Sequence, residues 1–163
     1  MEIRNYRETD WEQVWPIIEK EFRLGETYAF SPEITEQEAH KVWIETPRET
    51  YVAVADDSGI LGTYYIKPNQ PGLGSHVCNC GYIVSEQERG QGVASGMCEH
   101  SQQMALKLGF KAMQFNLVVS TNKGAIRLWK KLGFQIIGTL PKAYKSKKAG
   151  YIDALVMYKH FEV

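Results

Sequence analysis

A turn with two glycines joins a strand-like run to a long helical pattern, and no other stretch constrains the fold of this chain as strongly. The run Gly81–Val84 is apolar, Gly90 and Gly92 follow it, and an amphipathic helical pattern begins near Val93. The first amides of a helix have no acceptor within the helix and lie at the positive end of its dipole. Glycine lets an anion come close to such amides. The turn therefore predicts a binding site for a phosphate or pyrophosphate.

The spacing of this turn excludes two common phosphate-binding motifs. A nucleotide P-loop has Lys and then Ser or Thr directly after its last glycine, where this chain has Val93 and Ala94. The dinucleotide motif has three glycines in the spacing G-x-G-x-x-G and an acidic residue about 20 positions further on, and the chain does not match it. A different phosphate-containing ligand is therefore expected.

The segment from Arg89 to Ala94 reads RGQGVA and resembles the Arg/Gln-x-x-Gly-x-Gly/Ala signature of the GCN5-related N-acetyltransferases, the GNAT family. Val84 lies five positions before Arg89, where that family has an apolar residue. In the family this turn holds the pyrophosphate of acetyl-CoA. The resemblance implies an acetyl-CoA site here, and the alternative at this point is a glycine-rich loop without a ligand.

A second segment extends the resemblance. TNKGAIRLWKKLGF matches the family pattern Asn-x-x-Ala-x-x-Leu-Tyr-x-x-x-Gly-Phe except at the tyrosine, and the matching residues are Asn122, Ala125, Leu128, Gly133 and Phe134. The residues that the resemblance assigns to acetyl-CoA binding are Ile83, Val84, Arg89, Gly90, Gln91, Gly92, Val93, Ala94, Ser95 and Asn122.

Trp129 stands where the family has its tyrosine, which usually protonates the departing thiolate. An indole N–H is a donor only and does not release its proton near neutral pH, so we expect Trp129 to pack beside the cofactor instead. The thiolate then leaves unassisted, which a thiol pKa of about 8.5 permits, or it takes a proton from Tyr144, Tyr151 or water.

The length and the order of predicted elements indicate one domain. The 163 residues suit a single domain, 1–163, with a full hydrophobic core. Capping-box patterns at Thr9 with Glu12 and at Thr35 with Glu38 predict the starts of two helices. The later elements that we expect are hairpin strands 51–55 and 60–66, strand 76–84, helix 93–109, strand 113–119, helix 123–132, strand 134–140, a lysine-rich loop 141–150 and strand 151–161. This order predicts an α/β fold of the mixed, α+β-like kind that resembles the acetyltransferase fold, with a central mixed sheet of about seven strands and helices on both faces.

Composition and charge exclude several kinds of partner and site. Lys plus Arg and Asp plus Glu number 19 each, so neither nucleic acid nor an anionic membrane is expected as a partner. The N-terminus is charged and no apolar run approaches the roughly 20 residues of a membrane span, so we expect a cytoplasmic protein. The four histidines show no metal-ligand spacing, and no metal site is expected.

The three cysteines form neither a disulfide framework nor a zinc spacing. Cys78 and Cys80 lie two positions apart, which places them on one face of a strand, and we expect buried thiols. The alternative is a nucleophilic cysteine that passes on an acyl group, although the sequence places no histidine to activate it.

The resemblance also implies how the strands hold the reactants. In the GNAT family the strand before the phosphate turn has a bulge and splays from the next strand. Backbone groups near Val84 are then expected to hold the pantetheine arm and to polarise the thioester carbonyl. The first two helices line the acceptor site in that family, so Tyr28, Phe30 and Trp43 are candidates for its wall, although aromatic residues at such positions are more often core.

Asn79 and Asn116 each interrupt an apolar strand, where an amide is costly to bury unless it is paired. The second half of the chain resembles yeast acetyltransferases of this family that detoxify proline analogues such as azetidine-2-carboxylate. That resemblance implies that Asn79 and Asn116 are the catalytic pair that holds and orients the amino or imino acid while water takes the proton, and that Asn122 binds CoA. A strand amide that faces solvent is the alternative. Glu86, beside the turn, is a further candidate for a base, although a solvated carboxylate is more usual there.

These features predict an acetyl-CoA-dependent N-acetyltransferase that acts on a small-molecule amine or amino acid, with proline analogues among the candidates. A protein acetyltransferase, acting on a lysine or an N-terminus, shares every cofactor residue and is one alternative. A non-catalytic acyl-CoA sensor fits the missing tyrosine and is another. Pairing of such domains in the family makes a homodimer one option. The lysines of the loop 141–150 are candidates for binding a substrate carboxylate or the cofactor's 3′-phosphate, and a solvated basic loop is the alternative.

Overall fold

A single seven-stranded sheet runs through the molecule. The computed structural model describes residues 1–162. The strands are β1 (Glu2–Asn5), β2 (Glu49–Val54), β3 (Ile60–Pro68), β4 (Val77–Val84), β5 (Ala112–Val119), β6 (Gln135–Ser146) and β7 (Gly150–His160). Their order across the sheet is β1-β2-β3-β4-β5-β7-β6, and β4 and β5 are parallel while the other neighbours are antiparallel. The mixed sheet expected from the order of elements is confirmed.

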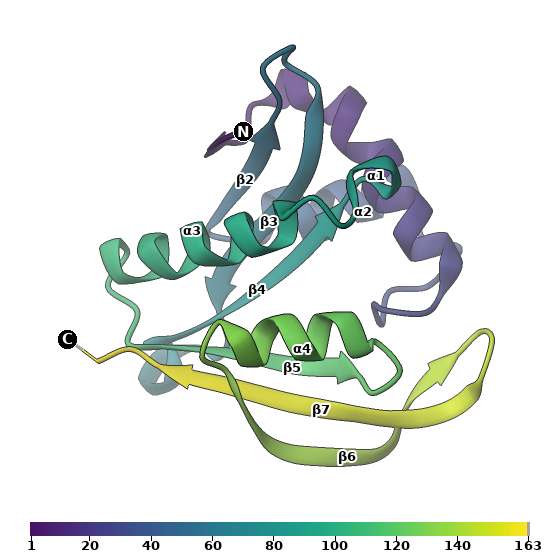
Figure 1. Ribbon diagram of the computed structural model, residues 1–163, viewed down its shortest axis with the longest axis vertical. Helices are drawn as coiled ribbons and strands as arrows, with labels where there is room; N and C mark the ends of the chain where they lie inside the picture. The colour runs from purple at the N-terminus through teal and green to yellow at the C-terminus, as the bar shows by residue number, and fades with distance from the viewer. Residues whose placement is uncertain (163) are drawn as a thin grey trace.

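Helices cover both faces of this sheet. They are α1 (Trp11–Leu24), α2 (Glu36–His40), α3 (Val93–Lys107) and α4 (Lys123–Lys131). α3 and α4 lie on one face and α1 and α2 on the other (Figure 1). Each face has its own buried cluster, with Met97 and Trp129 under α3 and α4, and Ile18, Phe22 and Trp43 under α1 and α2. No helix in residues 1–162 is long and apolar enough to cross a membrane.

The two parallel strands separate soon after they meet. β4 and β5 pair only at Val77 with Ala112 and at Cys78 with Met113, and they diverge beyond that point (Figure 1). The splay that the family resemblance implied is therefore present. It opens a gap in the middle of the sheet, between the end of β4 and the end of β5.

The expected bulge in β4 is wrong. The register between β3 and β4 is continuous from Gly62 opposite Val84 to Pro68 opposite Cys78. The irregularity lies in β5 instead, where two residues, Asn116 and Leu117, stand opposite the single position between the paired residues of β7. A bulge bends and twists its strand, so this one helps to turn β5 away from β4.

Of the two predicted capping boxes, one forms. Thr35 and Glu38 exchange hydrogen bonds of 3.2 Å each between side chain and backbone, and they start α2 as expected. Thr9 does not cap α1, whose N-cap residue is Asp10. The Asp10 carboxylate accepts from the Arg7 amide at 2.7 Å and pairs with Arg4 at 2.8 Å, so a partly buried ion pair fixes this end of the helix.

The predicted loop 141–150 is also wrong over most of its length. β6 continues to Ser146, and a register shift between Leu140 and Tyr144 accommodates Pro141. β6 is the last strand of the sheet, where a proline without an N–H is tolerated. Lys147, in the turn that follows, donates from Nζ to the Arg23 carbonyl at 3.2 Å.

Candidate active site

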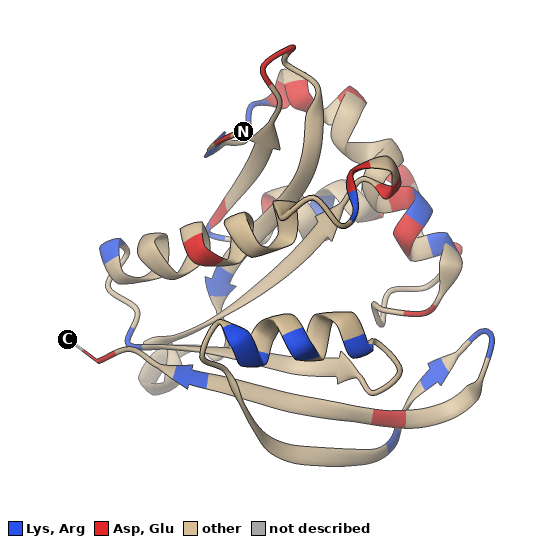
Figure 2. Cartoon of the chain, in the orientation of Figure 1, with Lys and Arg blue, Asp and Glu red and all other residues tan. Residues whose placement is uncertain are grey.

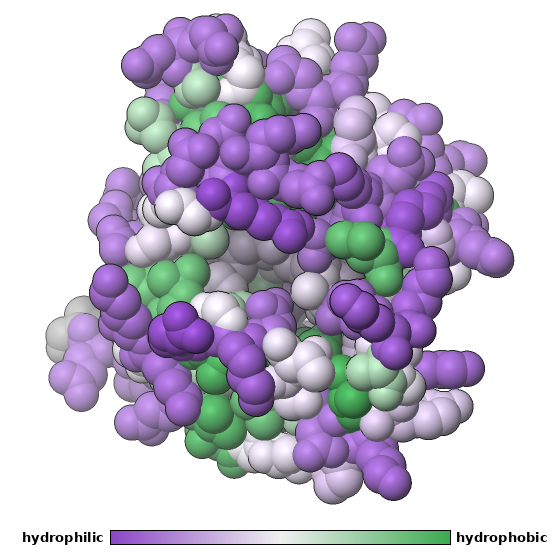
Figure 3. Space-filling view, turned by 45° about the vertical axis from the view of Figure 1, so that its right-hand side comes forward, coloured by the Kyte–Doolittle hydropathy of each residue, from purple (hydrophilic) through white to green (hydrophobic). Residues whose placement is uncertain are grey.

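A cavity of about 620 Å³ lies in the gap between β4 and β5. Its walls come from the ends of β3, β4 and β5, from α4, and from the end of α1 with the segment that follows it. The face seen in Figure 3 is hollowed near its centre, between rims of mostly hydrophilic side chains. The lining combines aromatic side chains with a few polar groups, which is typical of a small-molecule site.

The phosphate turn presents a row of free amides. Gly90 and Gly92 have φ of 77° and 82°, in the left-handed region that glycine adopts readily. Gly92 is the N-cap residue of α3 and provides no side-chain cap. Within residues 1–162, the N–H groups of residues 90 to 95 have no hydrogen-bond acceptor. A Cβ built on either glycine meets nothing within 4 Å, so the space before these amides is open to an anion. The turn fits a diphosphate.

The side chains of the turn take different places. Arg89 and Ala94 line the cavity, whereas the Val93 side chain is buried in the core and Gln91 donates to the Gln87 carbonyl at 3.4 Å. Residues 90 to 93 and Ser95 do not line the cavity. They can contact a ligand only through their backbone amides, which lie beside the cavity.

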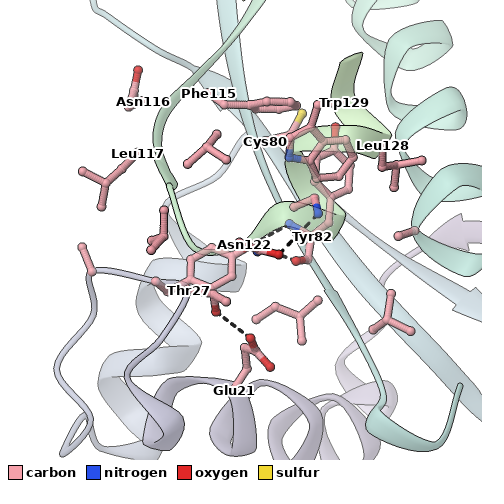
Figure 4. A pocket seen from close by; sticks show the side chains of 18 of the residues that line it. Glu21, Thr27, Cys80, Tyr82, Phe115, Asn116, Leu117, Asn122, Leu128 and Trp129 are labelled. Atoms are coloured by element: carbon pink, nitrogen blue, oxygen red, sulfur yellow. Dashed lines mark hydrogen bonds between the residues drawn. The ribbon is translucent and has the colours of Figure 1, made fainter. Parts of the chain in front are cut away.

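Arg89 is held from α1. Its guanidinium contacts the Glu21 carboxylate at 2.7 Å, and the same carboxylate accepts from the Thr27 hydroxyl at 2.5 Å. Figure 4 shows Glu21 and Thr27 together on the α1 side of the cavity. Nothing in the sequence linked Glu21 to the motif, because 68 positions separate it from Arg89.

α4, which forms part of the cavity wall, carries several basic residues. Lys and Arg recur along this helix (Figure 2), and all of them are exposed: Lys123, Arg127, Lys130 and Lys131. Gly124 and Ala125, in the first turn of α4, line the cavity. Asn122 caps the helix, since its Oδ1 accepts from the Ala125 amide at 3.3 Å, and it also lines the cavity. This positive flank suits a ligand that is rich in phosphate.

Ile83 and Val84 lie on β4 beside the gap and line the cavity. The Ser85 backbone N–H donates to the Leu61 carbonyl of β3 at 2.8 Å. Along an antiparallel strand, the backbone groups of successive residues point alternately toward and away from the neighbouring strand. The backbone of Val84 therefore faces away from β3, toward the gap, where the family resemblance implies the pantetheine contact. The Ile83 side chain packs in the α1 cluster instead, so Ile83 contributes a wall.

Beyond the point where β5 separates from β4, the Tyr28 side chain makes the hydrogen bonds to the β4 backbone that a neighbouring strand would make. Its hydroxyl accepts from the Tyr82 amide at 2.8 Å and donates to the Tyr82 carbonyl at 2.8 Å. Burial raises the pKa of Tyr28 well above its usual value, so the phenol stays protonated. Tyr28 and Phe30 line the cavity as expected, whereas Trp43 is fully buried core.

Trp129 packs beside the gap, as expected from its chemistry. Its ring centroid lies 5.1 Å from those of both Tyr82 and Phe115 (Figure 4). The two tyrosines named as substitutes for the family's acid do not line the cavity. Tyr144 donates to the Tyr28 carbonyl at 2.9 Å, and Tyr151 is 64% exposed.

Asn79 and Asn116 both line the cavity, from the neighbouring strands β4 and β5. Asn79 is buried, where its Nδ2 donates to the Gln114 carbonyl at 2.9 Å and its Oδ1 accepts from the Tyr65 hydroxyl at 3.2 Å. Asn116 lies at the outer edge (Figure 4), and its Nδ2 donates to Asn69 Oδ1 at 2.7 Å. Both line the cavity, and each amide nitrogen keeps a second N–H.

Two other sequence candidates are unsuited to chemistry here. Glu86 does not line this cavity, and its hydrogen bond with Lys20 lowers the pKa of its carboxyl, which disfavours a role as base. Cys80 does line it, but burial raises the pKa of its thiol well above the usual value. A neutral buried thiol is a poor nucleophile, and Cys78 and Cys98 are buried too.

Comparison with known proteins agrees with the geometry of the turn and the gap. The model of the Acetyltransferase (GNAT) family matches residues 11–134. This chain belongs to the GNAT family. It is 34% identical over 160 residues to N-acetyltransferase aca1 of Schizosaccharomyces pombe, covering 88% of this chain and 77% of that protein. It is 31% identical over 102 residues to L-amino acid N-acetyltransferase AaaT of Escherichia coli, and the match spans 62% of each chain.

Solved structures give the same result. A GCN5-related N-acetyltransferase from Kribbella flavida superposes with a TM-score of 0.93 at 38% identity, over 98% of this chain and 97% of the other. A phosphinothricin acetyltransferase from Sinorhizobium meliloti, solved with acetyl-CoA, has a TM-score of 0.86 at 16% identity, over 98% and 88%, and shares the fold. This GNAT protein is thus an acetyl-CoA-dependent N-acetyltransferase.

Proposed function

We propose that this GNAT enzyme acetylates the amine of a small molecule, in particular an amino or imino acid, with proline analogues included. The observation that carries the proposal is the cavity of about 620 Å³, which places two strand asparagines and an aromatic wall next to the splayed β4. A volume of this size suits a small acceptor. The name of AaaT, an L-amino acid N-acetyltransferase, points the same way for that protein.

Acetyl-CoA supplies the reactive thioester, and backbone groups do most of the binding. In this proposal the amides of residues 90 to 95 hold the diphosphate, and the Val84 backbone holds the pantetheine arm. Asn122, whose Oδ1 caps α4, offers its Nδ2 to the cofactor. Ile83 and Ala94 shape the slot through their contact with the cavity.

Asn79 and Asn116 orient the acceptor in this mechanism. An amide cannot take up a proton at neutral pH, so each acts through its spare N–H, while water accepts the proton of the amine. The acceptor amine must be neutral to attack, and holding it against the thioester provides much of the rate.

Tyr28 is the proton donor that Trp129 cannot be. Its phenol is protonated, it lines the cavity, and the Tyr82 amide donates to its oxygen at 2.8 Å. As the C–S bond breaks, the Tyr28 hydroxyl turns its proton from the Tyr82 carbonyl to the leaving sulfur. It takes up at the same time the proton that the water received from the amine, so no free phenolate forms, which the raised pKa of Tyr28 would disfavour. Tyr28 and the water each end with the protons they began with, so the cycle balances.

Release of CoA thiol tests the proposal. Purified protein is mixed with acetyl-CoA and, separately, with amino acids, imino acids that include azetidine-2-carboxylate, polyamines and a lysine peptide. Turnover with at least one small acceptor is expected. Labelled acetyl transferred to proteins of a lysate, with no small acceptor used, would favour the protein acetyltransferase. Tight CoA binding with no turnover on any amine would favour the acyl-CoA sensor.

We further propose that the chain acts as one domain, 1–163, and pairs with a second copy through the edge strand β6. This strand carries exposed apolar side chains, with Ile136 39%, Ile137 58% and Leu140 39% exposed. Unpaired edges of this kind favour association with another strand. Sedimentation of wild type and of Ile137→Lys distinguishes a dimer through β6 from a monomer.

A further inference from the structure

We propose that Lys67 binds the carboxylate of the acceptor, so that this enzyme selects amines that carry a carboxylate next to the reacting nitrogen. The inference rests on the proposed function and names the acceptor class more closely. Lys67 was not among the residues that the sequence singled out, since it is one lysine at the end of a strand next to a proline-rich loop.

The position of Lys67 places it at the acceptor end of the cavity. It lies near the end of β3, directly opposite Asn79 in the register of β3 and β4, and it lines the cavity. Side chains that are directly opposite on antiparallel strands project from the same face, about 5 Å apart at Cβ. Lys67 therefore shares the α1 face of the sheet with Asn79, Tyr65 and the acceptor wall.

The charge of Lys67 has no counterpart within the described chain. Three charged residues line the cavity, and Glu21 and Arg89 pair with each other at 2.7 Å. In residues 1–162, Lys67 Nζ makes neither an ion pair nor a hydrogen bond. Its nearest recorded contact is the Tyr65 ring, with Nζ 5.2 Å from the centroid. A partly buried ammonium of this kind is stabilised by an anion that enters with the ligand.

Tyr65 holds the ammonium in place. Its ring packs edge-on against Trp43 with centroids 4.8 Å apart, and its hydroxyl donates to Asn79 Oδ1 at 3.2 Å. Tyr65 therefore has a fixed orientation, and its face attracts the Lys67 cation. The cation and the Asn79 amide are thus parts of one preorganised cluster.

The polar groups at this end are suited to a carboxylate and not to an ammonium. Lys67 has only donors, and the spare N–H groups of Asn79 and Asn116 are donors as well. A carboxylate accepts from all three, with charge-assisted bonds to the lysine. A polyamine or a lysine side chain without a nearby carboxylate meets a like charge, which disfavours it.

The spacing along β4 agrees with a carboxylate close to the amine. Asn79 precedes Tyr82 by three residues, which is about 10 Å along a strand. The Tyr28 hydroxyl contacts the backbone of Tyr82, and in the proposed mechanism the acetyl transfer takes place there. The flexible lysine side chain covers part of this distance, and an amino or imino acid covers the rest.

The test compares Lys67→Gln, Lys67→Arg and the control Lys111→Gln, in which an exposed lysine outside the cavity is changed in the same way. The acceptors are the best amino or imino acid of the panel and its carboxamide, which keeps the amine and removes the charge. For Lys67→Gln we expect KM for the acid to rise about tenfold to 100-fold, while KM for acetyl-CoA stays within about twofold. Lys67→Gln should also lose the preference for the acid over the carboxamide. Lys67→Arg should keep most of this preference, and Lys111→Gln should behave as wild type.

Two results would overturn the assignment of Lys67. One is a Lys67→Gln enzyme that keeps the preference for acid over carboxamide. The other is a wild-type enzyme that acetylates polyamines or the lysine peptide in preference to every amino acid, which would leave a small-amine or protein acetyltransferase without this carboxylate site. A wild type without turnover on any amine would remove the proposed function itself, and with it the role of Lys67. An unchanged KM for acetyl-CoA and an unchanged melting temperature show that Lys67→Gln is folded.

Discussion

The cavity has two sides that are built in different ways. The side that we propose binds acetyl-CoA, called the donor side, runs from Val84 to the start of α3 and is made of consecutive backbone amides held by two glycines in the left-handed region. The side that we propose binds the amine substrate, called the acceptor side, is made of side chains from β3, β4, β5 and the segment after α1. A backbone site depends on conformation and tolerates many side chains, whereas a side-chain site depends on which residues stand at a few positions. The donor side therefore defines the family, and the acceptor side defines the substrate.

The largest effect should come from the donor side. Gly92→Val forces a β-branched residue to a φ of 82°, which is strained by about 1–2 kcal/mol, although its Cβ meets nothing. Relief of that strain moves the amides of α3, and the loss of two hydrogen bonds to phosphate should weaken CoA binding by roughly 100-fold or more. Calorimetric titration of wild type and Gly92→Val with CoA measures this change in affinity.

Gly72→Val is the matched control. Gly72 also has a positive φ, 56°, and open space at its Cβ, but it lies in the loop between β3 and β4 and does not line the cavity. It should lose a similar amount of stability and keep its CoA affinity. Equal losses of affinity in both variants would mean that strain alone, and not the position of the turn, controls binding.

The next largest effect is expected at Tyr28, which lies in the segment after α1 on the acceptor side and contacts β4, the strand that leads to the donor side. Tyr28→Phe leaves the Tyr82 amide and carbonyl without their partner, which should cost about 1–3 kcal/mol of stability. Loss of the proposed acid should lower kcat by about 100-fold with little change in KM for acetyl-CoA. Tyr144→Phe removes only the hydrogen bond to the Tyr28 carbonyl, so it should lower stability and leave kcat nearly unchanged.

The pH dependence gives a separate check on Tyr28. An acid must be protonated to act, and burial raises the pKa of Tyr28 above its usual value of about 10. The activity that depends on this proton should therefore persist through pH 10 in the wild type, as far as the protein stays folded. A wild-type kcat that falls with an apparent pKa near 8 would assign the acid to another group, and so would a Tyr28→Phe enzyme with full kcat.

The sequence predicts the donor side far better than the acceptor side. The glycine turn and the helix after it are local, so a few neighbouring residues suffice to specify them. The contact of Tyr28 with Tyr82 spans 54 positions, and nothing near Tyr28 announces it. Lys67 is similar, since its proposed role depends on Asn79, which stands opposite it on the neighbouring strand.

The wrong predictions have the same cause. The bulge was expected in β4 from the family and lies in β5, because strand register is set by pairing with β7 and not by the local residues. The proline and lysines of 141–146 favour a loop locally, but pairing with β7 extends β6 through them. By contrast an amide within an apolar strand is a local signal, and both Asn79 and Asn116 line the cavity, although Asn116 is exposed. Their catalytic role stays a prediction.

On the acceptor side itself, the two asparagines should differ. Asn79→Ala removes a buried amide with two partners, so kcat/KM for the acceptor should fall by roughly tenfold to 100-fold and stability should fall as well. Asn116 is exposed, and Asn116→Ala should lower kcat/KM less and leave stability nearly unchanged. KM for acetyl-CoA should stay constant in both. A larger effect at Asn116, or a change confined to acetyl-CoA, would contradict this division of the cavity.

The smallest effect is expected at the position where the chain departs from its family. Trp129→Tyr restores the family's phenol, but Trp129 is 9% exposed and packs against Tyr82 and Phe115, so a tyrosine there takes the same place in the aromatic wall. If Tyr28 already supplies the proton, a second phenol adds little, and kcat should stay within about threefold. A stopped assay of thiol release at saturating acceptor measures it. An increase of more than about tenfold would show that unassisted departure of the thiolate limits the wild type, and the double variant Tyr28→Phe with Trp129→Tyr would then be as active as Trp129→Tyr alone.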